Sequence, residues 1–136
     1  MLPGTLESFW IDSTITTSYP RLAEDVDVDV AVIGGGIAGL CTAWELAASG
    51  RSVAVLEADR IVTGVTGYTT AKLSSLHTLT YAKIAKSFGK AAARLYAQSQ
   101  QSAVERAVAL SAELGIDCDL ERVPVFTYAE SDVGVQ

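Results

Sequence analysis

The sequence predicts an α/β protein that opens with a parallel βαβ unit. Two β-branched apolar runs, residues 27–33 and 52–57, have the pattern of short strands, and the first becomes fully apolar, as strands do when a parallel sheet buries both faces. Between them, residues 37–49 carry apolar side chains at positions i, i+3, i+4 and i+7 of a helix. Gly50 follows, where a left-handed helix cap is expected. A crossover of this kind should be right-handed.

The segment before this unit, residues 1–26, is expected to be an extended arm. It has no hydrophobic period and is rich in Pro, Gly, Ser and Thr. The first 30 residues also carry six acidic side chains and a single basic one, so we expect a solvated acidic arm. Phe9, Trp10 and Tyr19 are expected to hold the arm to the body of the protein.

After the βαβ unit, the pattern predicts two helices over residues 81–88 and 90–114, with Gly115 as the cap of the second. Two further strands are expected over residues 116–120 and 123–128. The predicted organisation is therefore an arm (1–26), a nucleotide-binding part (27–115) and the start of another domain (116–136).

Composition limits the classes of function. The 136 residues are 49% hydrophobic and 19% charged, which is typical of a globular protein and not of a disordered chain. The net charge of −6 provides no basic field for nucleic acid. We expect no membrane span and no signal peptide, and the two cysteines have no CxxC spacing, so a cytoplasmic protein with reduced thiols is expected. Cys41, Cys118 and His77 do not predict a metal site.

The strongest chemical signal is the run of residues 34–39, GGGIAG, which matches G-x-G-x-x-G between a predicted strand and a predicted helix. Gly34 would allow the tight turn, Gly36 the close approach of a pyrophosphate, and Gly39 the close packing of helix on strand. The helix N-terminus would offer free N–H groups to a diphosphate.

Glu57 completes this nucleotide fingerprint at the end of the second predicted strand. Its carboxylate can accept hydrogen bonds from the ribose hydroxyls of an adenosine and would repel a 2′-phosphate, which disfavours NADP. The competing interpretation is a structural turn followed by a solvated strand end. The first strand, the glycines, the helix, Gly50, the second strand and Glu57 follow one another in the order that a nucleotide-binding unit requires, so the nucleotide interpretation is favoured. The same geometry suits FAD and NAD alike.

The next loop, residues 60–72, is rich in Gly and Thr. The hydroxyls of Thr66, Thr69 and Thr70 are suitable donors to phosphate or to a flavin edge, and Arg60 offers positive charge. A simpler role for Thr66 or Thr69 is to cap the next helix, which is compatible with cofactor contact.

Four stretches then carry a family resemblance: VDVAVIGGGIAGLCTAWELAASGRSVAVLEADRI, GVTGYTTAKLSSLH, and the flanking SFWIDST and GIDCDLERVPVFTYA. They resemble FAD-dependent oxidoreductases of the D-amino-acid oxidase and glycine oxidase type, most closely the subgroup that ends in a Rieske iron–sulfur domain. The resemblance implies a Rossmann-like FAD-binding domain, a small-molecule amine substrate that loses a hydride to FAD, and a Rieske domain encoded downstream.

The resemblance also implies a set of cofactor contacts along the chain, while no catalytic residue can be named. These contacts are Gly34, Gly36, Ile37, Ala38, Gly39, Glu57, Ala58, Arg60, Thr66, Gly67, Thr70, Ala71 and Lys72.

Enzymes of this type are considerably longer than 136 residues. We therefore expect an incomplete Rossmann-like domain followed by the first strands of a substrate domain, that is, the first part of a longer enzyme. An NAD-binding Rossmann module and a non-catalytic truncated remnant are the alternatives.

Overall fold

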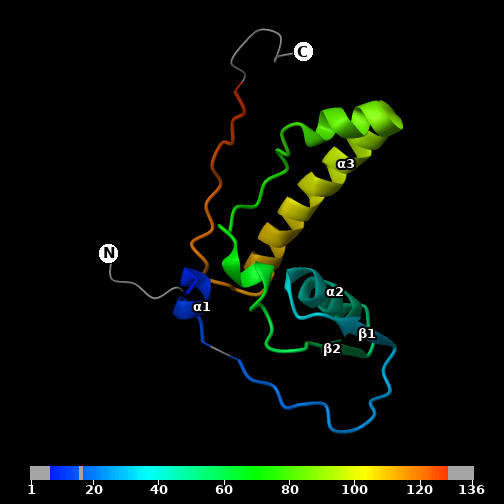
Figure 1. The fold of residues 1–136 in the computed structure, drawn as a ribbon, viewed down its shortest axis with the longest axis vertical. Helices are drawn as coiled ribbons and strands as arrows, with labels where there is room; N and C mark the ends of the chain where they lie inside the picture. Colours follow the sequence, from blue (N-terminus) through cyan, green and yellow to red (C-terminus); the bar gives the residue numbers. More distant parts are fainter. Residues whose placement is uncertain (1–6, 16, 129–136) are drawn as a thin grey trace. The chain divides into compact units, whose positions relative to one another are not determined.

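The structure is a computed structural model that describes residues 7–15 and 17–128. It divides into two units, one ending at Ala71 and one beginning at Lys72, which are described separately. In chain order, the elements drawn in Figure 1 are α1 (Phe9–Ser13), β1 (Val30–Ile33), α2 (Ile37–Ala48), β2 (Val53–Leu56), the 3₁₀ helix η1 (Val65–Tyr68) and α3 (Thr80–Glu113).

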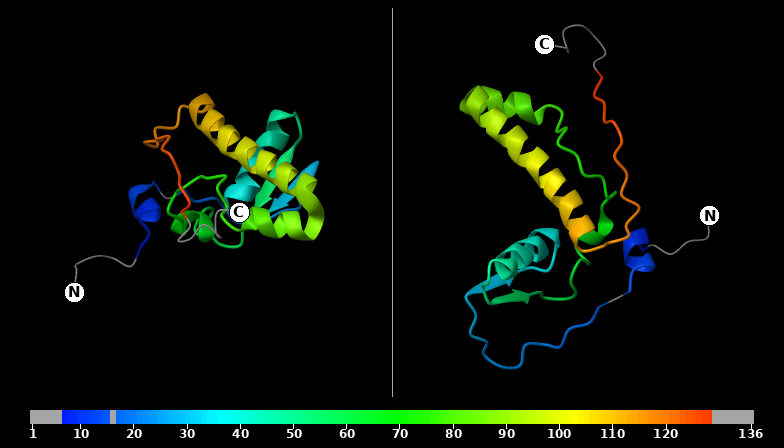
Figure 2. Two further views of the ribbon diagram at one scale, coloured as in Figure 1. Left: turned by 90° about the horizontal axis from the view of Figure 1, so that it is seen from above. Right: turned by 180° about the vertical axis from the view of Figure 1, so that it is seen from behind.

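The first unit contains the predicted βαβ arrangement. β1 and β2 pair in parallel, with Val30 opposite Val53 and Ile33 opposite Leu56. The connecting helix α2 packs on this two-stranded sheet, as both views in Figure 2 show. The strands are shorter than the apolar runs that predicted them, but their order and direction are confirmed.

Asp29 joins the beginnings of the two strands. Its Oδ2 accepts hydrogen bonds from the N–H and the hydroxyl of Ser52, both at 2.9 Å, and its own N–H donates to Ser52 Oγ at 2.9 Å. These bonds, led by that from the Ser52 backbone, lower the pKa of the Asp29 carboxyl. Asp29 therefore has a structural role that the predicted solvated arm did not include.

The prediction that β1 becomes buried on both faces is wrong for this chain. Ile33, at the end of β1, is 78% exposed, and no hydrophobic side chain among residues 7–15 and 17–128 is fully buried. A single helix on a two-stranded sheet covers one face only, and a closed core needs packed layers on both.

Helix α2 ends in the left-handed cap predicted at Gly50, whose φ is +86°. The Gly50 N–H donates to the carbonyl of Ala47 at 3.0 Å, and the Arg51 N–H donates to that of Leu46 at 3.1 Å. This pair of bonds is the Schellman motif, which satisfies carbonyls at the helix end.

Because a Cβ at Gly50 would be held in left-handed backbone, we expect Gly50→Ala to lower the free energy of unfolding by about 1–2 kcal/mol. Gly50→Asn should cost less, since asparagine tolerates this conformation. Urea unfolding of the three proteins measures both effects. Equal stability of Gly50→Ala and the unaltered protein would contradict the assigned cap.

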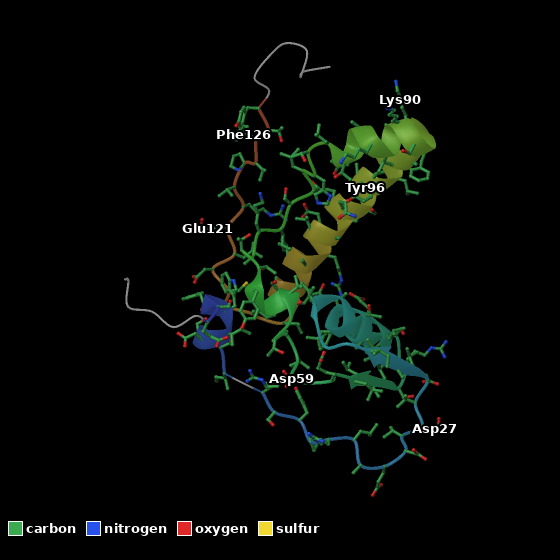
Figure 3. The ribbon with its side chains drawn as sticks, in the orientation of Figure 1. Asp27, Asp59, Lys90, Tyr96, Glu121 and Phe126 are labelled. Atoms are coloured by element: carbon green, nitrogen blue, oxygen red, sulfur yellow. The ribbon has the colours of Figure 1, made fainter. Side chains whose placement is uncertain are left out.

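The second unit is dominated by α3, which consists of two helices joined at Gly89. Gly89 has a φ of +86°, so the helical path breaks there, and Lys90 lies just past the break (Figure 3). Gly115 ends the second helix with a φ of +62°, and Ile116 N–H donates to the Ser111 carbonyl at 2.9 Å. The two predicted helices and their cap are confirmed.

His77, the single histidine, lies half-buried against this helix. Its Nδ1 is 2.8 Å from the hydroxyl of Tyr96, and its ring stacks on that of Tyr81 with centroids 6.2 Å apart. These contacts indicate a packing role in the second unit.

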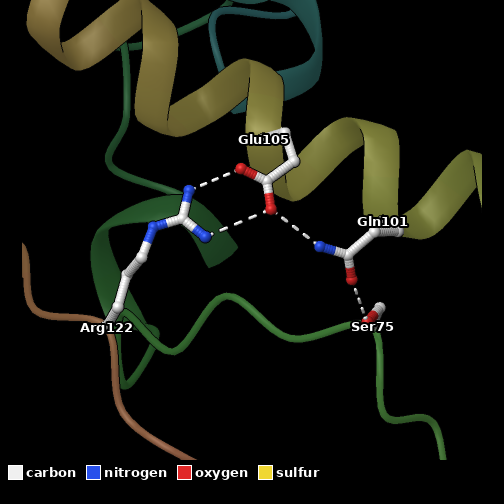
Figure 4. A network of polar contacts seen from close by, with 4 residues as sticks. All are labelled: Ser75, Gln101, Glu105 and Arg122. Carbon is white, nitrogen blue, oxygen red and sulfur yellow. Dashed lines mark hydrogen bonds and ion pairs between the residues drawn. The ribbon is translucent and has the colours of Figure 1, made fainter.

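The strands predicted over residues 116–120 and 123–128 are not formed. The described residues after Gly115 form no strand, Asp119 has a left-handed φ of +48°, and Phe126 is 85% exposed. The chain here is held by a side-chain network: Arg122 bonds both carboxylate oxygens of Glu105 at 2.5 and 3.1 Å. Gln101 donates to Glu105 at 2.8 Å and accepts from Ser75 at 2.7 Å (Figure 4). β-propensity alone makes no strand without a neighbouring strand to pair with.

Candidate cofactor-binding site

The glycine-rich turn has the steric features that the motif predicts. Gly34 leaves β1 with a φ of +102°, and its N–H donates to the carbonyl of Leu56 at 2.7 Å. A Cβ on Gly39 would lie 1.9 Å from the Gly34 oxygen. Gly34 therefore provides a left-handed turn, and Gly39 permits the close contact of α2 with that turn.

The N-terminus of α2 receives a cap from a distant residue. Thr66 Oγ1, in η1, accepts a hydrogen bond from the N–H of Ile37 at 3.0 Å. It also lies 3.3 Å from the position of a Cβ on Gly36. Thr66 thus caps α2, the preceding helix, and not the next helix along the chain as the simpler interpretation had it.

Both oxygens of the Glu57 carboxylate accept hydrogen bonds from backbone donors. Its Oε2 accepts from Gly35 N–H at 2.7 Å, and its Oε1 accepts from the N–H groups of Ala58 at 2.8 Å and Asp59 at 3.2 Å. These bonds, the one from Gly35 first, lower the pKa of the Glu57 carboxyl. The side chain is therefore ionised at neutral pH and fixed in place beside the glycine turn.

Gly35 is a site residue that the sequence prediction missed. It is buried, its N–H donates to Glu57, and its carbonyl accepts from Val62 N–H at 2.9 Å. A Cβ there would lie 2.6 Å from Cγ2 of Ile61. The available signal was a glycine in the middle of three consecutive glycines, at a position that G-x-G-x-x-G leaves free.

The N-terminal arm is not extended throughout: it contains α1, which contacts η1. Trp10 Nε1 donates to the carbonyl of Thr69 at 2.7 Å, which confirms the prediction for Trp10. Phe9 packs edge-on against Trp10, at 5.2 Å between ring centroids, but it and Tyr19 are both 70% exposed. A helix of only five residues depends on such tertiary contacts for its stability. It is also too short to leave a periodic hydrophobic pattern in the sequence.

A groove of about 1120 Å³ lies within the first unit, beside the ends of the strands. It is lined by residues 17–26, by Leu40, and by residues 54–61 from β2 onward, so it brings together Glu57, Ala58 and Arg60 of the predicted site. Figure 3 shows Asp59 past the end of β2 and Asp27 before the beginning of β1, at opposite ends of the sheet. The groove therefore runs along β2 and past its carboxyl end, and ligands bind at the carboxyl ends of the strands in open α/β sheets.

The remaining predicted residues lie further along the loop. Thr69 uses its hydroxyl locally, as acceptor for Ala71 N–H at 2.8 Å, and Ala71 itself has a φ of +54°. Thr70 lies between them, and Lys72 is the first residue of the second unit. Contacts of Thr70, Ala71 and Lys72 with a cofactor therefore stay predictions from the resemblance.

Within 7–15 and 17–128, no helix is both long and apolar enough to cross a membrane. Over the same ranges, no three His, Cys, Asp or Glu side chains gather as metal ligands would.

Taken together, the first unit has what a dinucleotide requires. The glycine turn lets the beginning of α2 contact Gly34 closely with no Cβ between them, the N-terminus of α2 begins at this turn, and a fixed carboxylate follows the second strand. These features define the class as a dinucleotide-binding βαβ protein.

The family can be stated more narrowly. Residues 29–136 match the family described as FAD dependent oxidoreductase, DAO. The chain therefore belongs to this family of FAD-dependent oxidoreductases, and FAD is the family's cofactor.

Several curated proteins are similar to this chain. A Bacillus subtilis protein, YhfW, whose name describes a Rieske 2Fe-2S iron–sulfur protein, is 37% identical over 130 residues, which are 96% of this chain and 26% of that one. Gamma-glutamylputrescine oxidoreductase of Escherichia coli is 35% identical over 101 residues, 74% of this chain and 24% of that one. Thiamine thiazole synthase of Desulfosudis oleivorans is 54% identical over 39 residues, 29% of this chain and 15% of that one.

The chain spans about a quarter of the length of the first two of these relatives. No solved structure gives a significant match.

Proposed function

We propose that this chain is the FAD-binding portion of an oxidoreductase that oxidises an amine or amino-acid-like substrate. The observation that carries the proposal is the fixed, ionised Glu57 joined to the glycine turn through Gly35. In this proposal residues 27–115 bind FAD and residues 116–136 belong to the substrate domain.

Each part of the first unit has a role in binding. The turn at Gly34 and Gly36 admits the diphosphate. The N–H groups of Ala38 and Gly39 at the beginning of α2 face its charge, while that of Ile37 donates to Thr66. Glu57 accepts hydrogen bonds from the ribose hydroxyls, and Arg60 adds positive charge in the groove. FAD, when bound, supplies the acceptor for a hydride removed from the carbon that bears the amine.

The relatives support the choice of substrate and partner. One of them is named an oxidoreductase of gamma-glutamylputrescine, an amine, and another a Rieske iron–sulfur protein. We propose an amine as substrate and a Rieske domain as electron partner. The free thiols of Cys41 and Cys118 fit a reducing compartment, so we place the protein in the cytoplasm.

The test is purification of the protein that the intact gene encodes. We expect a yellow protein with the visible absorbance bands of bound flavin, and competitive titration should show preference for FAD over NAD. Preference for NAD would favour the Rossmann-module alternative. A colourless protein that takes up no added FAD would contradict the proposal and favour a non-catalytic remnant.

A further inference from the structure

Three contacts hold α1 against η1. Tyr68 donates its hydroxyl to Glu7 Oε1 at 3.0 Å, and Trp10 Nε1 donates to the Thr69 carbonyl at 2.7 Å. Ile11 packs on Gly67, where a Cβ would lie 2.5 Å from Ile11 Cδ1. We call Glu7, Trp10 and Ile11 the N-terminal clasp.

The contact surface of the clasp is specific. Gly67 is buried, and its missing Cβ would also lie 2.4 Å from the Val62 carbonyl oxygen, so Gly67 is packed between Ile11 and Val62. The Glu7 carboxylate, which accepts the hydrogen bond, raises the pKa of Tyr68 and keeps its hydroxyl a donor.

Thr66 lies in η1, and its Oγ1 accepts a hydrogen bond from the Ile37 N–H at 3.0 Å. A threonine hydroxyl has one donor in addition to its acceptor lone pairs. While Thr66 accepts from Ile37, its own O–H is left to donate to an anion at the same helix end. The clasp contacts the three residues that follow Thr66, namely Gly67, Tyr68 and Thr69.

We propose that the N-terminal clasp is a positioning element for the cofactor: it holds η1 so that the Thr66 hydroxyl caps α2 and donates to the FAD diphosphate. This inference rests on the proposed function. It assigns to the arm, some 20 residues before the glycine motif, a role in cofactor affinity.

The test uses the full-length protein and two measurements, the Kd for FAD and hydrogen exchange of the peptide over residues 34–39 without FAD. Trp10→Phe combined with Tyr68→Phe keeps an aromatic ring at each position and removes both donors. We expect faster exchange in this peptide and an FAD Kd about tenfold higher. Trp44→Phe, a tryptophan change on α2 outside the clasp, is the matched control and should alter neither measurement.

A double-mutant cycle shows whether the clasp acts through Thr66. Thr66→Val should also raise the Kd about tenfold, whereas Thr66→Ser, which keeps the hydroxyl, should restore affinity. In the Thr66→Val background, the double Phe variant should raise the Kd no further. A full additional effect there, or unchanged exchange in the double Phe variant, would overturn the inference.

The two proposals fail in different ways. If the unaltered protein does not bind FAD, the proposed function fails and the inferred role toward FAD fails with it. If the unaltered protein binds FAD and the double Phe variant binds it equally well, the inference alone is overturned.

Discussion

Gly39→Ala is expected to destabilise the first unit and to weaken FAD binding, although alanine is the better helix former. Helix propensity alone would favour alanine by up to about 1 kcal/mol. The new Cβ would lie 1.9 Å from the Gly34 oxygen and 3.3 Å from Val32 Cγ1, a contact with backbone that cannot rotate away. We expect a net loss of about 1–3 kcal/mol in the free energy of unfolding.

The same substitution should raise the Kd for FAD about tenfold or more, because α2 must move away from the turn that receives the diphosphate. Urea unfolding and flavin titration measure the two effects. Ala47→Gly, on the exposed part of α2, is the control. It should cost about 1 kcal/mol by propensity and leave the Kd unchanged. Increased stability in Gly39→Ala would show that the close contact is absent.

The βαβ unit was predictable because its signals are local. β-branched runs, a helical apolar stripe and Gly50 each follow from the nearest residues in the chain, and the structure places β1, α2, β2 and that cap accordingly. The steric roles of Gly34 and Gly39 were predictable for the same reason, since both residues of this close contact belong to the same six-residue motif.

What could not be predicted depends on residues distant in sequence. Thr66 caps a helix that begins 29 positions earlier, and Trp10 contacts a carbonyl 59 positions later. The strands expected over residues 116–120 and 123–128 had β-propensity but found no partner strand among residues 72–128, and Arg122 holds this part of the chain instead. Gly35 was missed because its role arises from contact with Ile61 and Glu57, which no local pattern shows.

Glu57→Gln is expected to have the second large effect, because both carboxylate oxygens are acceptors. Oε2 accepts a hydrogen bond from the N–H of Gly35, while Oε1 accepts from the N–H groups of Ala58 and Asp59. An amide keeps one acceptor and turns an NH₂ group toward the other N–H groups, so at least one bond is lost. With the turn loosened and the ribose acceptor altered, we expect FAD affinity to fall on the order of ten- to hundredfold. Asp27→Asn, which removes the same charge outside the groove, should leave affinity unchanged.

The pH dependence of the FAD-free protein gives a separate check on Glu57. Hydrogen bonds from the backbone lower the pKa of its carboxyl below the ordinary 4.5, so the folded state favours the ionised form. The stabilisation is fully present above pH 4.5 and is lost as the pH falls through the lower pKa of the folded state. Thermal unfolding from about pH 7 to about pH 3 should therefore show the Tm difference between the unaltered protein and Glu57→Gln shrinking on acidification. The pKa of Asp29 is lowered in both proteins, so its contribution to the pH dependence cancels from the Tm difference. A difference that stays constant or grows toward low pH would contradict an ionised Glu57 as the group that holds the glycine turn.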